Sequence, residues 1–234
     1  MRIQTALTRM VGIEHPVVQT GMGWVAGARL VSATANAGGL GILAAATMTI
    51  DELATAIGKV KSATDRPFGV NIRADAADAG DRIDLMIREG VKVASFALAP
   101  KQELVVRLKE AGAVVIPSVG AAKHARKVAG WDADAVIVQG GEGGGHTGPV
   151  PTTLLLPSVL DALEGTGIPV IAAGGFFDGR GLARGARPRG GLRCPLQLAG
   201  RHEPVVQRPA GRPAPFDHPP GERRNREGPG RRAA

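Results

Sequence analysis

The feature that most constrains this fold is a regular alternation of short apolar segments with amphipathic segments along residues 1–182. Strands that are buried on both faces read as continuous apolar runs rich in Val and Ile. A strict alternation of such strands with helices indicates a parallel α/β sheet. The predicted strands are HPVVQT (15–20), LGILAA (40–45), FGVNI (68–72), VKVASFA (91–97), AVVIPSV (113–119), AVIVQG (135–140) and IPVIAAGG (168–175).

The amphipathic segments between these strands predict helices. The clearest is IDELATAIGKVKSA over residues 50–63, for which we expect Asp51 to be the N-cap. Gly90 and Gly112 stand where two later helices should end, because glycine commonly follows the last turn of a helix. Seven βα units of this kind predict a TIM-type (β/α)8 barrel that is incomplete.

The eighth strand of the barrel is missing from the pattern. It would be due near residue 190, where the sequence has no β-branched run and where Pro188 and Pro195 would interrupt a central strand. We therefore expect an incomplete α/β barrel over residues 1–182 and a disordered Arg/Pro/Gly-rich tail over residues 183–234. A natural basic tail is one explanation of the break. A shift of reading frame near codon 183 is the favoured one, because the break falls inside a structural unit.

The charge and the cysteine content exclude several classes of function. The net charge of +8 resides entirely in residues 183–234, which contain one aromatic residue, Phe216. Basic charge alone supports non-specific association, so no specific nucleic-acid binding is expected. Cys194 is the only cysteine, which excludes an intrachain disulfide and a cysteine-based zinc cluster. No apolar run is long enough for a membrane span and no secretory signal is recognisable, so a cytoplasmic setting and no membrane partner are expected.

Glycine-rich loops follow several of the predicted strands. Strand 15–20 runs into GMG, strand 135–140 into GEGGGHTG, and strand 168–175 ends in two glycines. In a parallel barrel the chemistry lies where strands end and loops begin. Glycines let a ligand approach the backbone, and loop amides can bind a phosphate. The pattern therefore predicts a planar cofactor that carries a phosphate, and no metal-ligand spacing is visible.

These motifs resemble a known family. HPVVQTGMG, GGLGIL, a strand that ends in Asn, VQGGEGGGHTG and IPVIAAGGFFDGRG occur in the order and spacing of the nitronate monooxygenase (2-nitropropane dioxygenase) family. Its members are FMN-dependent TIM-barrel flavoproteins, to which flavin-dependent enoyl reductases are similar. Within it, the chain most resembles an actinobacterial branch that acts on coenzyme A thioesters in steroid-ring degradation. The resemblance covers residues 10–182, and the family's last strand, which reads like GAxGVxxGTRF, has no match in residues 183–234.

The resemblance implies specific roles for residues of this chain. His146 would be the catalytic base, which takes a proton from an acidic carbon while electrons pass to the flavin. Gly175 and its neighbour would give amides to the phosphate, and Asn71 would bind a polar edge of the flavin ring. Apart from the resemblance, we expect Glu142 to orient the loop, with a role as base as the alternative. The expected FMN-binding residues are Gly21, Met22, Gly23, Asn71, Gln139, Gly144, Gly145, Gly174 and Gly175.

Alternatives remain for both the residues and the function. Asn71 could instead end its strand by bonding its own backbone, Met22 could belong to the core, and Gly174 with Gly175 could form only a tight turn. The leading function is oxidation of nitronates. The alternatives are a flavin-dependent enoyl- or acyl-CoA reductase or dehydrogenase of steroid or lipid degradation, and an inactive truncated product. The substrate would be a small molecule, either a nitronate or an acyl-CoA thioester, and the sequence does not indicate the oligomeric state.

Overall fold

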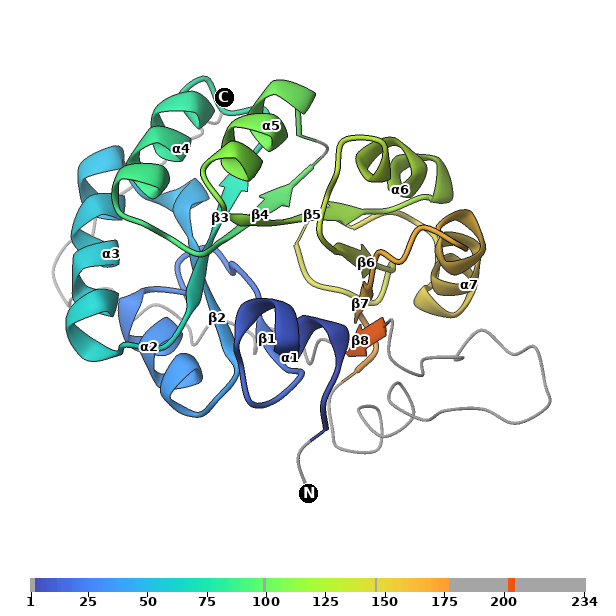
Figure 1. Cartoon of the computed structure of the whole chain (residues 1–234), viewed down its shortest axis with the longest axis horizontal. Coiled ribbons are helices and arrows are strands. Elements are labelled where there is room, and N and C mark those ends of the chain that lie inside the picture. Colours follow the sequence, from blue (N-terminus) through green and yellow to red (C-terminus); the bar gives the residue numbers. More distant parts are fainter. Residues whose placement is uncertain (1–2, 99, 146, 177–201, 205–234) are drawn as a thin grey trace, which may run out of the picture.

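A computed structural model describes residues 3–98, 100–145, 147–176 and 202–204 of the chain, and shows a curled parallel sheet surrounded by helices (Figure 1). The order of strands in the sheet follows the order of the sequence, and each strand pairs in parallel with the next. The parallel α/β architecture is therefore confirmed. The strands are β1 Val18–Gln19, β2 Leu40–Ala44, β3 Phe68–Arg73, β4 Val93–Ala97, β5 Val114–Val119, β6 Val136–Gln139, β7 Val170–Ala173 and β8 His202–Pro204.

The helices lie between these strands along the chain. They are α1 Ala6–Val11, α2 Ala28–Asn36, the 3-10 helix η1 Ala45–Thr47, α3 Ile50–Ala63, α4 Ala79–Arg88, α5 Gln102–Glu110, α6 Ala122–Ala129 and α7 Thr152–Ala162. None of the helices in the described ranges is long and apolar enough to span a membrane.

The ends of three predicted helices show where local sequence rules worked and where they failed. The expectation that Asp51 caps α3 is wrong. Thr49 is the N-cap, because its side chain accepts the Glu52 backbone N–H while the Glu52 carboxylate accepts the Thr49 N–H, which forms a capping box. The predicted helix ends are confirmed, since Gly90 and Gly112 have φ angles of +63° and +75°.

The barrel is incomplete, as expected. No pairing between β8 and β1 closes the sheet among the described residues, although β8 pairs with β7 through Val170↔His202 and contacts α1. The three-residue strand β8 lies within the segment that the sequence interpretation assigned to the tail. The predicted boundary at residue 182 and the predicted disorder of the remaining tail fall outside the described residues.

Two layers of apolar side chains hold the half-barrel together. The inner layer lies within the curl and includes Leu40 and Ile42 of β2, Ile137 of β6 and Ile171 of β7. Leu7 of α1 belongs to the same layer and is fully buried. The outer layer packs the other faces of the strands against α3–α5 on one side and against α6 and α7 on the other. Figure 1 shows α2 to α7 on the outside of the curled sheet.

Candidate functional site

Side chains on the inner face of the sheet change from apolar to polar toward the carboxyl ends of the strands. Successive side chains of a strand point to opposite faces, so buried Val93 shares its face of β4 with Ser95. In β6 the same alternation places Gln139 on the face of Ile137. Asn71 lies beside Ser95 in the register of β3 and β4. The open end of the curl therefore carries amide and hydroxyl groups above an apolar floor.

Gly21 and Asn71, two residues predicted at the cofactor, lie against each other. A Cβ atom on Gly21 would come within 2.4 Å of the Asn71 Cβ, so no larger residue fits without movement. The Asn71 Nδ2 donates to the Ser95 Oγ at 2.8 Å, and Ser95 is buried. The Asn71 side chain thus bonds the next strand rather than its own backbone, and β3 continues to Arg73. Its Oδ1 accepts no hydrogen bond from the part of the chain that the structure describes.

The Gln19 side chain at the end of β1 supplies a second free acceptor, and the sequence interpretation gave it no role. Its Nε2 donates to the Thr20 carbonyl at 2.5 Å and to the Ile42 carbonyl at 3.1 Å. Its Oε1 is buried and has no partner among the described residues. Because buried polar atoms are normally hydrogen-bonded, this oxygen indicates a missing donor.

Three glycines around β6 and β7 are required by packing within the protein. A Cβ atom on Gly140 would lie 2.1 Å from the Thr152 Oγ1 and 2.3 Å from its backbone nitrogen. A Cβ on Gly143 would lie 2.8 Å from the Gln139 Cγ, and one on Gly174 would lie 2.8 Å from the Gly143 nitrogen. The Thr152 Oγ1 also lies 3.1 Å from the Gly174 carbonyl oxygen. The glycines at these three positions therefore have a structural reason that does not involve a ligand.

Glu142 orients this loop, as the sequence interpretation expected. Its Oε2 accepts the Thr152 backbone N–H at 2.8 Å and lies 2.8 Å from the Thr152 Oγ1. Thr152 begins α7 and is buried, so the carboxylate caps the helix where a negative charge is favoured. The bond from the Thr152 N–H lowers the pKa of Glu142 below its ordinary value, although burial opposes the shift. A carboxylate held in this way is a poor proton acceptor. Sequence reasoning had not singled out Thr152.

The tip of the glycine loop is open. A Cβ atom on Gly144 or Gly145 would meet no atom within 4 Å, and Gly145 has a φ of +80°. The Gln139 Nε2 donates to the Gly144 carbonyl at 2.7 Å and so fixes the loop from the inner side. His146, the predicted base, lies outside the described residues.

The remaining predicted residues also lie at this end of the sheet. Met22 is half-buried and belongs to none of the apolar clusters formed by the described residues, and its carbonyl accepts the Ala26 backbone N–H at 2.8 Å. Gly23 packs against Thr47, whose Cγ2 would lie 3.1 Å from an added Cβ. Gly175 has a φ of +81° and is open apart from the Glu142 Cβ at 3.9 Å.

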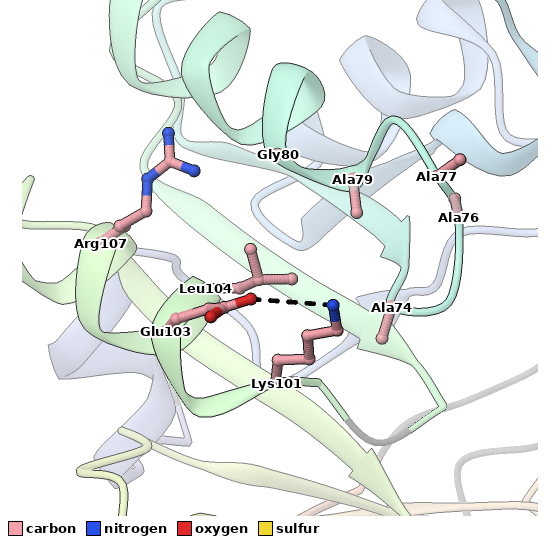
Figure 2. A pocket seen from close by; sticks show the side chains of 9 residues that line it. All are labelled: Ala74, Ala76, Ala77, Ala79, Gly80, Lys101, Glu103, Leu104 and Arg107. Atoms are coloured by element: carbon pink, nitrogen blue, oxygen red, sulfur yellow. Dashed lines mark ion pairs between the residues drawn. The ribbon is translucent and has the colours of Figure 1, made fainter.

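Two hollows open near these residues, at the same end of the sheet. One holds about 400 Å³ between the loop after β3 and the start of α5 (Figure 2). Its floor is made of alanines, and the Lys101 ammonium lies 3.8 Å from the Glu103 carboxylate. The other holds about 490 Å³ beside Trp24 and Thr47. Within the described ranges, no group of three His, Cys, Asp or Glu side chains could hold a metal ion.

The residues present fit a flavin by their chemistry. The free Asn71 Oδ1, near the carboxyl end of β3, can accept from the ring N–H of a flavin. The orphaned Gln19 Oε1 is buried at the end of β1, and β2 lies between β1 and β3 in the sheet. The open backbone of Gly145 and Gly175 exposes amides of the kind that bind phosphate. Glu142 adds the only negative charge of the glycine loop over residues 140–145, and the α7 N-terminus already binds it.

Comparisons with known proteins agree with this assignment. The chain matches the nitronate monooxygenase family over residues 4–187. It is 86% identical over 183 residues to a Mycobacterium tuberculosis protein named (3aS,4S,5R,7aS)-5-hydroxy-7a-methyl-1-oxo-octahydro-1H-indene-4-carboxyl-CoA dehydrogenase, a match that covers 78% of this chain and 52% of that protein. A Rhodococcus jostii protein of the same name is 77% identical over 181 residues, 77% of this chain and 50% of that protein.

Solved structures show the same fold. The structure of FabK from Thermotoga maritima has a TM-score of 0.76 and 40% identity, and covers 87% of this chain and 60% of that one. The nitroalkane oxidase of Streptomyces ansochromogenes has a TM-score of 0.69 and 30% identity, and covers 76% of this chain and 63% of that one. The chain spans about half the length of the two curated relatives named above. The match over residues 4–187 covers most of the sequence, and the chain therefore belongs to the nitronate monooxygenase family.

Proposed function

We propose that this chain binds FMN at the carboxyl ends of its strands and acts as an oxidoreductase on the coenzyme A thioester of a cyclic acid. The contact of Gly21 with Asn71 is the observation that carries the proposal. It brings the glycine run after β1 against an amide whose oxygen has no partner among the described residues. The name of the relative that is 86% identical supports the thioester as substrate.

The residues of the chain would divide the work as follows. Asn71 would hold the flavin ring through its free oxygen, and Gly175 with Gly174 would present amides to the phosphate. Bound FMN would supply a two-electron acceptor. His146 would take the proton from the acidic carbon of the substrate, since imidazole titrates near neutral pH. Glu142 would keep the loop that carries His146 attached to α7.

Oxidation of nitronates is the second candidate. The family match and the 30% identity to a nitroalkane oxidase favour it. A neutral nitroalkane carries an acidic proton next to its nitro group, as a thioester does next to its carbonyl. His146 would take that proton and so form the nitronate that is then oxidised. The two candidates differ in substrate and in whether oxygen is consumed.

Replacement of His146 by Ala tests the catalytic proposal. We expect the flavin content to stay unchanged and turnover to fall by about 10²- to 10⁴-fold, the usual contribution of general-base catalysis. The assay follows flavin reduction by the CoA thioester without oxygen, and oxygen uptake with 2-nitropropane, the neutral nitroalkane that still carries its acidic proton. Normal turnover by the variant would remove His146 from the mechanism. Loss of flavin would instead make His146 a structural residue of the loop.

A further inference from the structure

Trp24 is the most unusual surface residue among those described. It directly follows the Gly21–Gly23 run, its side chain is 93% exposed, and its φ of +58° is in the left-handed region that non-glycine residues rarely adopt. Val25 beside it is 57% exposed. A contiguous exposed apolar patch is a feature of many binding sites.

Contacts around Trp24 hold it in this conformation. The Thr47 Oγ1 accepts the Trp24 backbone N–H at 3.3 Å, and the Met22 carbonyl accepts the Val25 N–H at 3.1 Å. The buried Arg82 side chain fixes the segment around Thr47, because it donates to the Ala45 carbonyl at 2.6 Å and to the Met48 carbonyl at 2.8 Å. A strained residue persists only where its surroundings determine its conformation, and strain of this kind gathers at ligand sites.

An apolar groove of about 490 Å³ runs beside Trp24. Ala44, the last residue of β2, Ala56 of α3 and Met48 give it an apolar lining, and its size is within the range of small-molecule sites. The groove therefore opens at the same strand ends as the candidate flavin site, and only Gly23 separates Trp24 from Met22.

The charges around the groove favour an uncharged occupant. Asp51, Glu52 and Lys59 line its α3 side, so carboxylates outnumber the single ammonium. The Glu52 carboxylate is already bound to the Thr49 N–H at 2.8 Å. This balance disfavours the phosphates of coenzyme A, whereas a hydrocarbon ring that lies over the apolar part of the lining would gain contact with the indole.

We propose that Trp24 and this groove bind the fused alicyclic ring of the substrate, and so determine specificity for ring-containing acyl groups. This inference rests on the proposed function, which supplies the cyclic thioester. An aromatic face of this size gains binding by burial of apolar surface, and here the gain would be specific to thioesters that carry a ring.

Tryptophan fluorescence tests the inference without any activity assay. The chain has two tryptophans, and Trp131→Phe leaves Trp24 as the only emitter. The probes are the CoA thioester of octahydroindene carboxylic acid and, for comparison, acetyl-CoA. We expect the ring thioester alone to shift the Trp24 emission to shorter wavelength and to protect it from acrylamide. Unchanged emission and quenching with the ring thioester would overturn the inference. Protection that is present without any thioester and disappears on dilution would overturn it too, in favour of self-association.

Calorimetric titration of variants gives the second measurement. We expect Trp24→Ala to weaken binding of the ring thioester by about 10- to 100-fold, Trp24→Phe to restore most of it, and acetyl-CoA to bind equally in all of them. Leu154→Ala is the matched control, because Leu154 is 65% exposed on α7 and does not line the groove. Equal binding by Trp24→Ala and the parent would overturn the inference. Flavin content, measured in parallel, separates the two proposals. A protein that holds FMN but whose Trp24 is not protected by the ring thioester would refute only the inference. A protein whose Trp24 is protected but that holds no FMN would refute only the proposed function.

Discussion

The two sides of the candidate site use glycine for different reasons. On the β1–β3 side, Gly21 makes room for Asn71 of a strand that is distant in sequence. On the β6–β7 side, Gly140 and Gly174 make room for Thr152, and only the tip of the loop, around Gly145, is open. The comparison shows that a glycine-rich loop is not uniformly a ligand cradle. Much of it can be packing, so the glycine content of a loop does not by itself identify ligand contacts.

The largest effect that this comparison predicts is at Gly140. Gly140→Ala would place a Cβ atom 2.3 Å from the Thr152 backbone nitrogen, and a backbone atom cannot turn away as a side chain can. We expect the free energy of unfolding to fall by about 3 kcal/mol, the upper end of the usual range for overpacking. Urea denaturation measures it, and Gly144→Ala is the matched control.

Gly144 lies in the same loop, and an added Cβ there would meet no atom within 4 Å. Its substitution should change the free energy of unfolding by less than about 0.5 kcal/mol. If the free energy of unfolding fell equally in Gly140→Ala and Gly144→Ala, the two positions would not differ in packing. The distinction between packed and open glycines would then be wrong.

The next effect is at Gly21 on the other side of the site. Gly21→Ala would force the Asn71 Cβ away from its position, so we expect the stability to fall by about 2 kcal/mol and FMN to be lost together with it. Gly58→Ala is the control, because Gly58 lies within α3 with nothing within 4 Å. It should gain about 0.5 to 1 kcal/mol from helix propensity and keep its flavin. A Gly21→Ala protein with parent-like stability and flavin content would contradict the contact.

The smallest effect is the pH dependence at Glu142. The pKa of its carboxyl group is lowered in the folded chain, so its contribution to stability is fully present above the ordinary pKa of a glutamate. That contribution is lost as the pH falls below this value and through the lowered pKa. Glu142→Gln should therefore unfold more easily than the parent at neutral pH, and the difference should shrink in acid. A constant difference between the two denaturation curves at all pH values would mean that ionisation of Glu142 does not stabilise the loop.

The sequence predicted the strands well because burial on both faces leaves a continuous apolar run, as in β6, and the start and end of α3 followed from its amphipathic pattern. The sequence pattern did not reveal that Thr49 caps α3. Thr49 and Asp51 are both of a residue type that caps helices, and the backbone conformation shows which of them precedes the first turn. The sequence pattern also missed Ser95 and Thr152. Ser95 stands inside an apolar run, and its pairing with Asn71 depends on strand register, which the local pattern does not reveal.

Titration of the purified, unmodified chain with FMN is the decisive measurement for the proposed cofactor site. We expect saturable binding of one FMN per chain with a shift of the flavin absorbance bands. We also expect that Asn71→Ala binds about tenfold more weakly, the equivalent of one hydrogen bond of about 1.4 kcal/mol. A chain that is folded by circular dichroism and yet binds no FMN would contradict the account, as would an Asn71→Ala variant that binds FMN as tightly as the parent.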